Sequence, residues 1–146
     1  MDNKVALGSD HGGWALKEAV SNALTEAGYQ AVDFSAATET PVDYPDIGHK
    51  VALEVSTGRI DRGILVCGTG IGMSLVANRY PGVRAALCHN IYTARMSREH
   101  NDANILVLGG RVIGEGLALA MLDCWLNTPF GEGRHRRRID KVNPVK

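Results

Sequence analysis

The sequence predicts an α/β fold in which parallel strands form a single sheet with helices on both faces. Three observations lead to this prediction. Short apolar runs alternate along the chain with longer segments whose apolar residues recur at helical spacing. The central run, Ile64 to Cys67, is apolar throughout, which is typical of a strand covered on both faces. Polar residues follow the strands, at the edge where such sheets bind their ligands.

The first half of the chain provides two strands and two helices before the central strand. We expect a strand over Lys4–Ser9, then a helix from Trp14 to Ala27, because its apolar residues recur at helical spacing and a glycine follows. Gln30–Phe34 is expected to form the second strand. Residues 35–45 are then a loop, and residues 46–57 a helix that ends before a glycine.

The second half repeats the alternation of strand and helix three times. The segments expected are strand 63–67 with a helix to about Asn78, strand Val83–Cys88 with helix Ile91–Glu99, strand Asn104–Leu108 with helix 113–126, and a final helix to about Val142. Five strands alternating with helices fit a single domain over residues 1–146.

The composition of the chain argues against several kinds of binding partner. The chain has 45% hydrophobic and 22% charged residues and a formal net charge of zero, so we expect no nucleic-acid partner. No apolar run approaches a membrane span, and the first residues lack the pattern of a signal peptide; we expect no membrane partner and a cytoplasmic location. The three cysteines are odd in number and show no zinc-ligand spacing, which favours reduced thiols and no metal.

The segment Cys67-Gly68-Thr69-Gly70-Ile71-Gly72 carries the strongest functional signal. Alternating glycines let backbone N–H groups approach an anion, and the helix that follows adds its own unpaired N–H groups. A cysteine at such a place is a candidate nucleophile or base. The alternative is a glycine-rich turn between strand and helix with an ordinary buried cysteine, and the segment alone leaves both open.

Three other glycine-loop motifs do not match this segment. Met73 stands where the dinucleotide fingerprint needs its third glycine, and where a tyrosine-phosphatase loop needs its arginine. The segment also lacks the Gly-Lys-Ser/Thr of a nucleotide-triphosphatase phosphate loop. These three classes of site are therefore excluded.

Further candidates flank the predicted strands. Asp10 and His11 follow the first strand, and two basic residues four apart, Arg134 and Arg138, would project from one side of the final helix, where they suit a phosphate monoester. The alternatives for these arginines are a solvated face or a nucleic-acid patch. Cys88 and Cys124 lie in apolar patterns and are expected to be inert.

At this point the chain resembles a known family. The motifs GSDHGG, DYPD, VCGTGIGMS, HNDAN, LGGR and GRHRRR occur in the order and spacing of the ribose-5-phosphate isomerase B family, which also holds galactose-6-phosphate and allose-6-phosphate isomerases. The resemblance implies a three-layer α/β/α sandwich with a Rossmann-like five-stranded parallel sheet. It also implies a homodimer or dimer of dimers with active sites shared between chains, and no cofactor.

The implied reaction interconverts an aldose phosphate and a ketose phosphate through an enediolate, which needs a base and donors around the developing oxyanions. Ribose 5-phosphate is the expected substrate. The alternatives are an allose, galactose or tetrose phosphate, or a non-catalytic sugar-phosphate-binding subunit. One branch of the family uses a glutamate base on the following helix. Residues 73–75 supply no carboxylate, so the cysteine branch is favoured.

The resemblance also assigns roles to individual residues. Cys67 would be the base, with Thr69 hydrogen-bonded to it, and His100 would open the sugar ring. The expected substrate-binding residues are Asp10, His11, Tyr44, Gly68, Gly70, Ile71, Gly72, Asn101, Arg111, Arg134 and Arg138. Of these, His11 and the three arginines would bind the phosphate, and Asn101 the sugar hydroxyls or the enediolate.

Two expectations concern details of the site. Glu132 lies two residues before Arg134, where relatives usually have a glycine, and a carboxylate there disfavours phosphate unless it points away. For the shared site, we expect Cys67 and the arginines of 134–138 from one chain, and His100 to Arg111 from the other.

Overall fold

The computed structural model describes residues 3–142 and has the predicted sheet. All strand pairs are parallel, and the strand order is β2-β1-β3-β5-β4. The strands are β1 (Lys4–Ser9), β2 (Gln30–Asp33), β3 (Arg62–Cys67), β4 (Ala85–Leu87) and β5 (Ile105–Gly109). The chain therefore winds from β1 to one side of the sheet and then, from β3 on, to the other, which places the topological switch point between β1 and β3.

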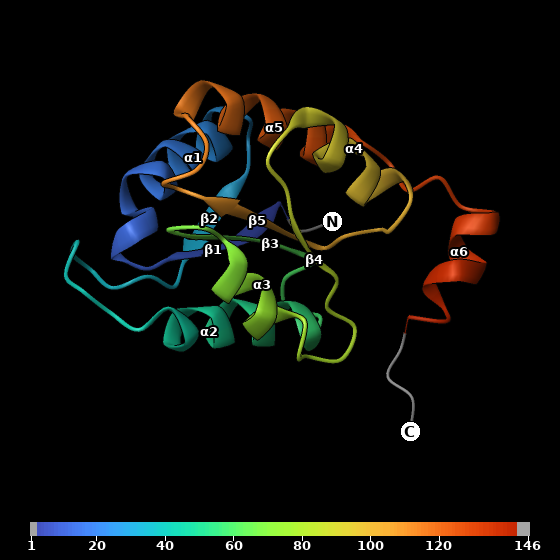
Figure 1. Ribbon diagram of the computed structural model, residues 1–146, viewed down its shortest axis with the longest axis horizontal. Coiled ribbons are helices and arrows are strands. Elements are labelled where there is room, and N and C mark those ends of the chain that lie inside the picture. The colour runs from blue at the N-terminus through green and yellow to red at the C-terminus, as the bar shows by residue number, and fades with distance from the viewer. Residues whose placement is uncertain (1–2, 143–146) are drawn as a thin grey trace.

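Helices cover both faces of this sheet (Figure 1). On one face lie α1 (Trp14–Glu26), α4 (Ile91–Glu99) and α5 (Glu115–Asn127), and on the other α2 (Tyr44–Ser56) and α3 (Ile71–Ala77). The short α6 (Arg134–Ile139) stands apart from both layers, and a 3-10 turn, η1 (His11–Gly13), joins β1 to α1. The predicted three-layer α/β/α architecture is confirmed.

Strand alternation divides the core into two halves. Successive side chains of β3 point to opposite faces, so Ile64 and Val66 pack with α1 and α5, whereas Leu65 and Cys67 pack with α2. All four side chains are almost fully buried. This alternation places the Cys67 side chain on the α2 face, at the last position of the central strand.

Several boundaries differ from the sequence prediction. Helix α2 begins at Tyr44 rather than at residue 46, because Pro45 occupies its first turn, where a fixed φ and a missing N–H suit a helix start. Strand β4 lacks Val83 and Arg84, whose N–H groups bond to Tyr80 O and to the Asn104 side chain. At the C-terminal end, α5 begins at Glu115 rather than at residue 113, and α6 ends at Ile139 rather than near Val142.

The strand directions define two edges of the sheet. The loops after β1, β3 and β5 lie at the carboxyl edge, and the residues that precede these strands lie at the amino edge. Strand β5 has five residues and spans about 16 Å at ~3.3 Å per residue. The residues that precede β5 in the sequence are therefore separated from those that follow it by about the length of this strand. Within residues 3–142, no helix is long and apolar enough to cross a membrane.

Candidate active site

Three loops meet at the carboxyl edge and are hydrogen-bonded to one another. Gly110 N donates to Cys67 O at 2.8 Å, and Arg111 N donates to Gly68 O at 2.9 Å, so the loop after β5 is fixed to the loop after β3. From the other side, Asp10 N donates to Val66 O at 3.3 Å. The glycine loop thus lies between the ends of β1 and β5, at the switch point of the sheet.

Cys67 is the last residue of β3, where these loops meet, and is 4% exposed. Gly70 N donates a hydrogen bond to its Sγ at 3.1 Å. Gly70 has φ of +81°, and a Cβ there would lie 3.2 Å from Leu108 O. Only glycine fits this position, and its conformation directs the amide at the sulfur.

The Thr69 hydroxyl has a different partner from the one expected. Thr69 Oγ1 accepts a hydrogen bond from Ile71 N at 3.2 Å, the first residue of α3. Among the described residues, the hydrogen-bond donor to Cys67 Sγ is the Gly70 amide and not the Thr69 hydroxyl. The expectation that Thr69 bonds Cys67 is therefore corrected: in this chain Thr69 orders the turn into α3.

Tyr44 and the residues after β1 pack against the glycine loop. A Cβ on Gly72 would lie 2.5 Å from the Tyr44 ring, so the ring packs directly on this glycine. The Asp10 side chain is buried and accepts from Gly13 N at 3.1 Å, which fixes the 3-10 turn. His11 Nδ1 accepts from Val42 N at 3.3 Å, which joins the turn to the loop before α2.

Arg111 brings a positive charge to the glycine loop. Its guanidinium lies against Gly68, because a Cβ on that glycine would be 3.4 Å from Arg111 Nη1. We call this assembly the Cys67 cluster, and it consists of Asp10, His11, Tyr44, Cys67 to Gly72, and Arg111. All of these come from one chain and lie at one edge of the sheet.

The remaining predicted site residues lie elsewhere. His100 follows α4 at the amino edge, where its ring stacks on that of His135, with centroids 4.3 Å apart and 14° between the planes. Gly131 N also donates to Glu99 O at 2.9 Å, so the segment before α6 is fixed to the end of α4. We call this second group the His100 cluster: His100, Asn101, Arg134, His135 and Arg138.

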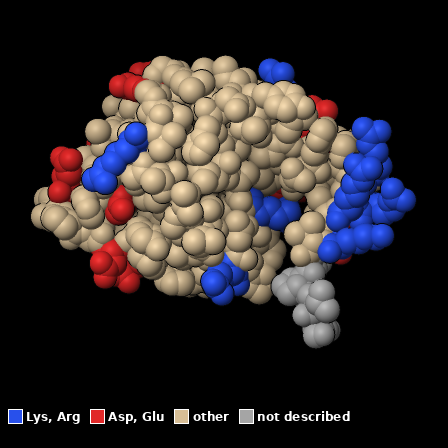
Figure 2. Space-filling view, in the orientation of Figure 1, with Lys and Arg blue, Asp and Glu red and all other residues tan. Residues whose placement is uncertain are grey.

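His135 is the residue that the sequence reasoning missed, because no local pattern links it to a residue 35 positions earlier. Partial burial, followed by the positive charges of His100, Arg134 and Arg138, lowers the pKa of His135. The basic side chains of α6 form the blue area at one end of the molecule in Figure 2. A cluster of this charge is suited to an anion.

The residues around α6 divide into those that hold the helix and those that are free to bind. Arg136 lies 3.9 Å from the Asp102 carboxylate, and its guanidinium lies 4.7 Å from the centre of the Phe130 ring. The Glu132 carboxylate is also 3.9 Å from Arg136, and its side chain is 70% exposed. The charge of Glu132 is therefore directed to Arg136 and not to the two arginines expected to bind phosphate.

The two other cysteines, Cys88 and Cys124, lie outside both clusters. Cys88 is buried, and burial raises the pKa of its thiol, in keeping with the inert role expected. Cys124 is only partly buried, and its sulfur lies 3.8 Å from Thr128 Oγ1. Across residues 3–142, no group of three or more His, Cys, Asp or Glu side chains is arranged to hold a metal ion.

Comparison with known proteins identifies the family. Residues 5–142 match the model of the Ribose/Galactose Isomerase family. The chain is 41% identical to ribose-5-phosphate isomerase B of Escherichia coli, over 98% of this chain and 96% of the relative. It belongs to the ribose/galactose isomerase family.

Two further members of this family bear on structure and substrate. The structure of Clostridium thermocellum ribose-5-phosphate isomerase B matches with a TM-score of 0.93 and 54% identity, covering 95% of this chain and 94% of that one. D-erythrulose-4-phosphate isomerase of Pectobacterium atrosepticum is 39% identical, over 94% of this chain and 91% of the relative. The predicted family and fold are thereby confirmed, and members of similar identity carry different substrate names.

For this isomerase, the expected division of the site between chains is wrong in two respects. We expected Arg111 to act with His100, but Arg111 lies against Gly68 in the Cys67 cluster. The arginines of α6, expected with Cys67, lie with His100 instead. The reason is strand direction: Asn101 precedes β5 and Arg111 follows it, so the two lie at opposite edges of the sheet.

Proposed function

We propose that this chain is an aldose–ketose isomerase that interconverts ribose 5-phosphate and ribulose 5-phosphate, with Cys67 as the base. The observation that carries the proposal is the Gly70 amide, 3.1 Å from the sulfur of the buried Cys67. The names of the E. coli and C. thermocellum relatives support the substrate.

The chemistry requires one proton to move between neighbouring carbons and a second to move between the oxygens that they carry. The Cys67 thiolate takes the proton from C2 of the open-chain aldose, and the C1 carbonyl becomes an enediolate. The thiol then returns a proton to C1, while the hydroxyl proton of the C2 oxygen passes to the C1 oxygen and the C2 oxygen becomes a carbonyl, so no electron leaves the substrate. A single base beside both carbons is sufficient for this exchange.

Charge on the enediolate needs fixed donors nearby. The amides of Gly68 and Gly72 are candidates, because the loop that carries them is held by the hydrogen bonds of Gly110 and Arg111. Donors that are already oriented cost no reorganisation when the charge develops. The Tyr44 ring, packed on Gly72, limits the access of water to this place.

The Cys67 cluster lacks a group to open the sugar ring, and the His100 cluster has one. Within one chain the two clusters lie at opposite edges of the sheet, which β5 alone keeps about 16 Å apart. We infer that each active site joins the Cys67 cluster of one chain to the His100 cluster of a second copy. A homodimer with two-fold symmetry then contains two equivalent sites, and a dimer of dimers contains four.

In this arrangement the phosphate is bound from both sides. His11 and Arg111 contribute from the first chain, and Arg134 and Arg138 from the second. Asp10 binds a sugar hydroxyl, His100 transfers the proton that opens the ring, and Asn101 binds the hydroxyls or the enediolate. Reduced thiols are required for this chemistry, in keeping with a cytoplasmic location.

A second substrate class has a specific observation in its favour, namely the 39% identity to a D-erythrulose-4-phosphate isomerase. The deciding experiment is a panel of kcat/KM values for ribose 5-phosphate, allose 6-phosphate, galactose 6-phosphate and a tetrose phosphate. We expect the highest value for ribose 5-phosphate. A higher value for another sugar would reassign the substrate, and no turnover of any would favour a sugar-phosphate-binding subunit.

A further inference from the structure

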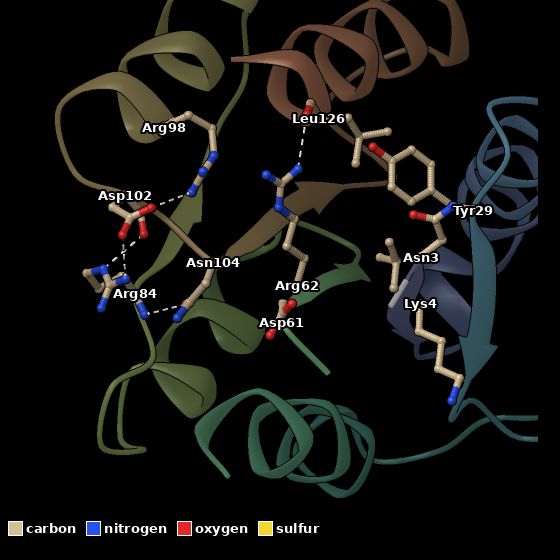
Figure 3. A pocket seen from close by; sticks show the side chains of 11 residues that line it. Asn3, Lys4, Tyr29, Asp61, Arg62, Arg84, Arg98, Asp102, Asn104 and Leu126 are labelled. Atoms are coloured by element: carbon tan, nitrogen blue, oxygen red, sulfur yellow. Dashed lines mark hydrogen bonds and ion pairs between the residues drawn. The ribbon is translucent and has the colours of Figure 1, made fainter. Parts of the chain in front are cut away.

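A cavity of about 380 Å³ lies at the amino edge of the sheet, opposite to Cys67. Figure 3 shows it from close by. It is lined by the residues at or just before the strand starts and by neighbours from α4 and α5: Asn3, Lys4, Val5, Tyr29, Asp61, Arg62, Arg84, Arg98, Asp102, Asn104 and Leu126. None of these belongs to the Cys67 cluster or the His100 cluster, so the cavity has no part in the proposed reaction.

The lining has more positive than negative charge. Arg62, Arg84 and Arg98 face the two carboxylates of Asp61 and Asp102. The Asp102 carboxylate is already shared, because Arg98 Nη1 lies 2.9 Å from one oxygen and Arg84 Nη2 lies 3.2 Å from the other. It therefore has little capacity to neutralise a third arginine.

Arg62 is that third arginine. Its Nη1 donates to Leu126 O at 3.0 Å, and no carboxylate of residues 3–142 lies within ion-pair distance of its guanidinium. In Figure 3 the Arg62 side chain projects into the space between Tyr29 and Arg98. Burial, and next the positive charge of Arg98, lower the pKa of Arg62. Asp102 and Asp61 attract the guanidinium from a distance, but within residues 3–142 no carboxylate lies close enough to form an ion pair with it.

Arg98 also keeps one donor unpaired, although its Nη1 donates to Asp102 Oδ1 at 2.9 Å and to Ala103 O at 2.7 Å. It is 7% exposed, and its Nε has no hydrogen-bond partner within residues 3–142. Both guanidiniums lie 5.7 Å from the centre of the Trp125 ring, so the fold holds two like charges against one indole. Two arginines held together in this way favour an anion, which can accept hydrogen bonds from both.

We propose that this cavity binds the phosphate group of a small phosphate monoester, at a second site distinct from the catalytic one. A phosphate carries close to two negative charges at neutral pH and three acceptor oxygens, which suits two guanidiniums better than a carboxylate does. The volume exceeds that of a phosphate group alone, and Asn3, Tyr29 and Asp61 offer polar atoms for the hydroxyls of an attached sugar.

The test is a titration with inorganic phosphate, followed through backbone amide NMR shifts of the whole chain. Amides of Tyr29 and Asn104 report on the cavity, and the amide of Gly70 reports on the catalytic loop. In Arg62→Met, which removes the charge and keeps the apolar stem, phosphate affinity at Tyr29 and Asn104 falls about tenfold or more, while the Gly70 response is unchanged. Arg95→Met removes an exposed arginine of α4 and serves as the matched control.

A second variant changes the charge in the opposite direction. Asp61 is exposed, so Asp61→Asn keeps the fold, and the loss of its negative charge tightens phosphate binding at the cavity reporters several-fold. Acetate, a monoanion, shifts the same amides less than phosphate does at equal ionic strength. Tyr29 and Asn104 amides that do not respond to phosphate in the wild type, or that respond alike in Arg62→Met, Asp61→Asn and wild type, overturn the proposal.

Discussion

Arg111 and Gly68 are joined both through the backbone and through the side chain. Arg111 N donates to Gly68 O at 2.9 Å, and the guanidinium lies over the same glycine. Arg111 and Cys67 therefore belong to the same half of the proposed site, and we propose that the His100 cluster of a second chain provides the other half.

Mixed dimers test this division directly. Take Cys67→Ala in one chain and Arg138→Ala in the other. In a mixed dimer both lesions fall in one site and the other site is intact, so random reassembly restores about a quarter of wild-type activity. Pairing Cys67→Ala with Arg111→Ala leaves one lesion in every site and restores nothing. Activity that returns in the second pairing, or in neither, contradicts the division, provided that mixed dimers are shown to form.

The base is tested with Cys67→Ala. Loss of a positioned general base lowers kcat by about 10²–10⁴-fold, and exchange of solvent deuterium into the sugar phosphate stops with it. Cys88→Ala is the matched control, because that thiol is buried and burial raises its pKa. If Cys67→Ala retains exchange, the base is another group.

The phosphate partners are tested on α6. Arg138→Ala removes a charge-assisted contact worth about 1.5–3 kcal/mol, so KM rises by at least about tenfold. Some of that binding energy also positions the reacting carbon, and kcat falls as well. Arg137→Ala is the control, since Arg137 is exposed and lies outside the proposed site. Arg136 is unsuitable, because it lies near Asp102 and Phe130. Equal losses at 137 and 138 indicate a diffuse basic surface.

A pH dependence follows from the stacked histidines. Partial burial and the charges of His100, Arg134 and Arg138 lower the pKa of His135 in the folded chain. The unfolded chain then binds more protons just below pH ~6.5, so the free energy of unfolding decreases as the pH falls through that value. Denaturant unfolding between acid and neutral pH measures this slope. It is shallower in His135→Asn, and His89→Asn, which changes an exposed histidine, keeps the wild-type slope.

An ion pair between the buried Lys17 and the partly exposed Asp33 gives a prediction for stability. Lys17 is 1% exposed, and its Nζ lies 2.8 Å from Asp33 and over the Trp14 ring. Burial alone would raise the pKa of Asp33, but hydrogen bonds from Lys17 and Ser35 outweigh it, and the pKa is lowered. The Asp33 contribution is therefore present above the unfolded pKa of ~3.9 and is lost as the pH falls further.

Asp33→Asn accordingly lowers the free energy of unfolding by about 1–2 kcal/mol at neutral pH. In strong acid the difference from wild type disappears. Glu18→Gln is the comparison, because Glu18 also pairs with Lys17 but its side chain is 53% exposed, and its loss costs less. An equal loss in the two variants at neutral pH contradicts a specific role for Asp33.

The sequence alone determined the elements that depend on local pattern. Apolar runs and helical spacing located the five strands and their helices, and the glycines after Cys67 located the loop at the switch point. Errors arose at boundaries, where a single proline or side chain decides, as at Tyr44 and Val83. The opposite positions of Asn101 and Arg111 could also have been inferred, because one precedes β5 and the other follows it.

Only the tertiary structure decided the contacts between distant segments. The stacking of His135 on His100, the Tyr44 ring on Gly72 and the Arg62–Arg98 pair on Trp125 each join residues from different elements. Local periodicity reports which face of an element is buried, but not which residue of another element meets it. That choice is made when the helices pack on the sheet, because strand order and direction then fix which loops share an edge.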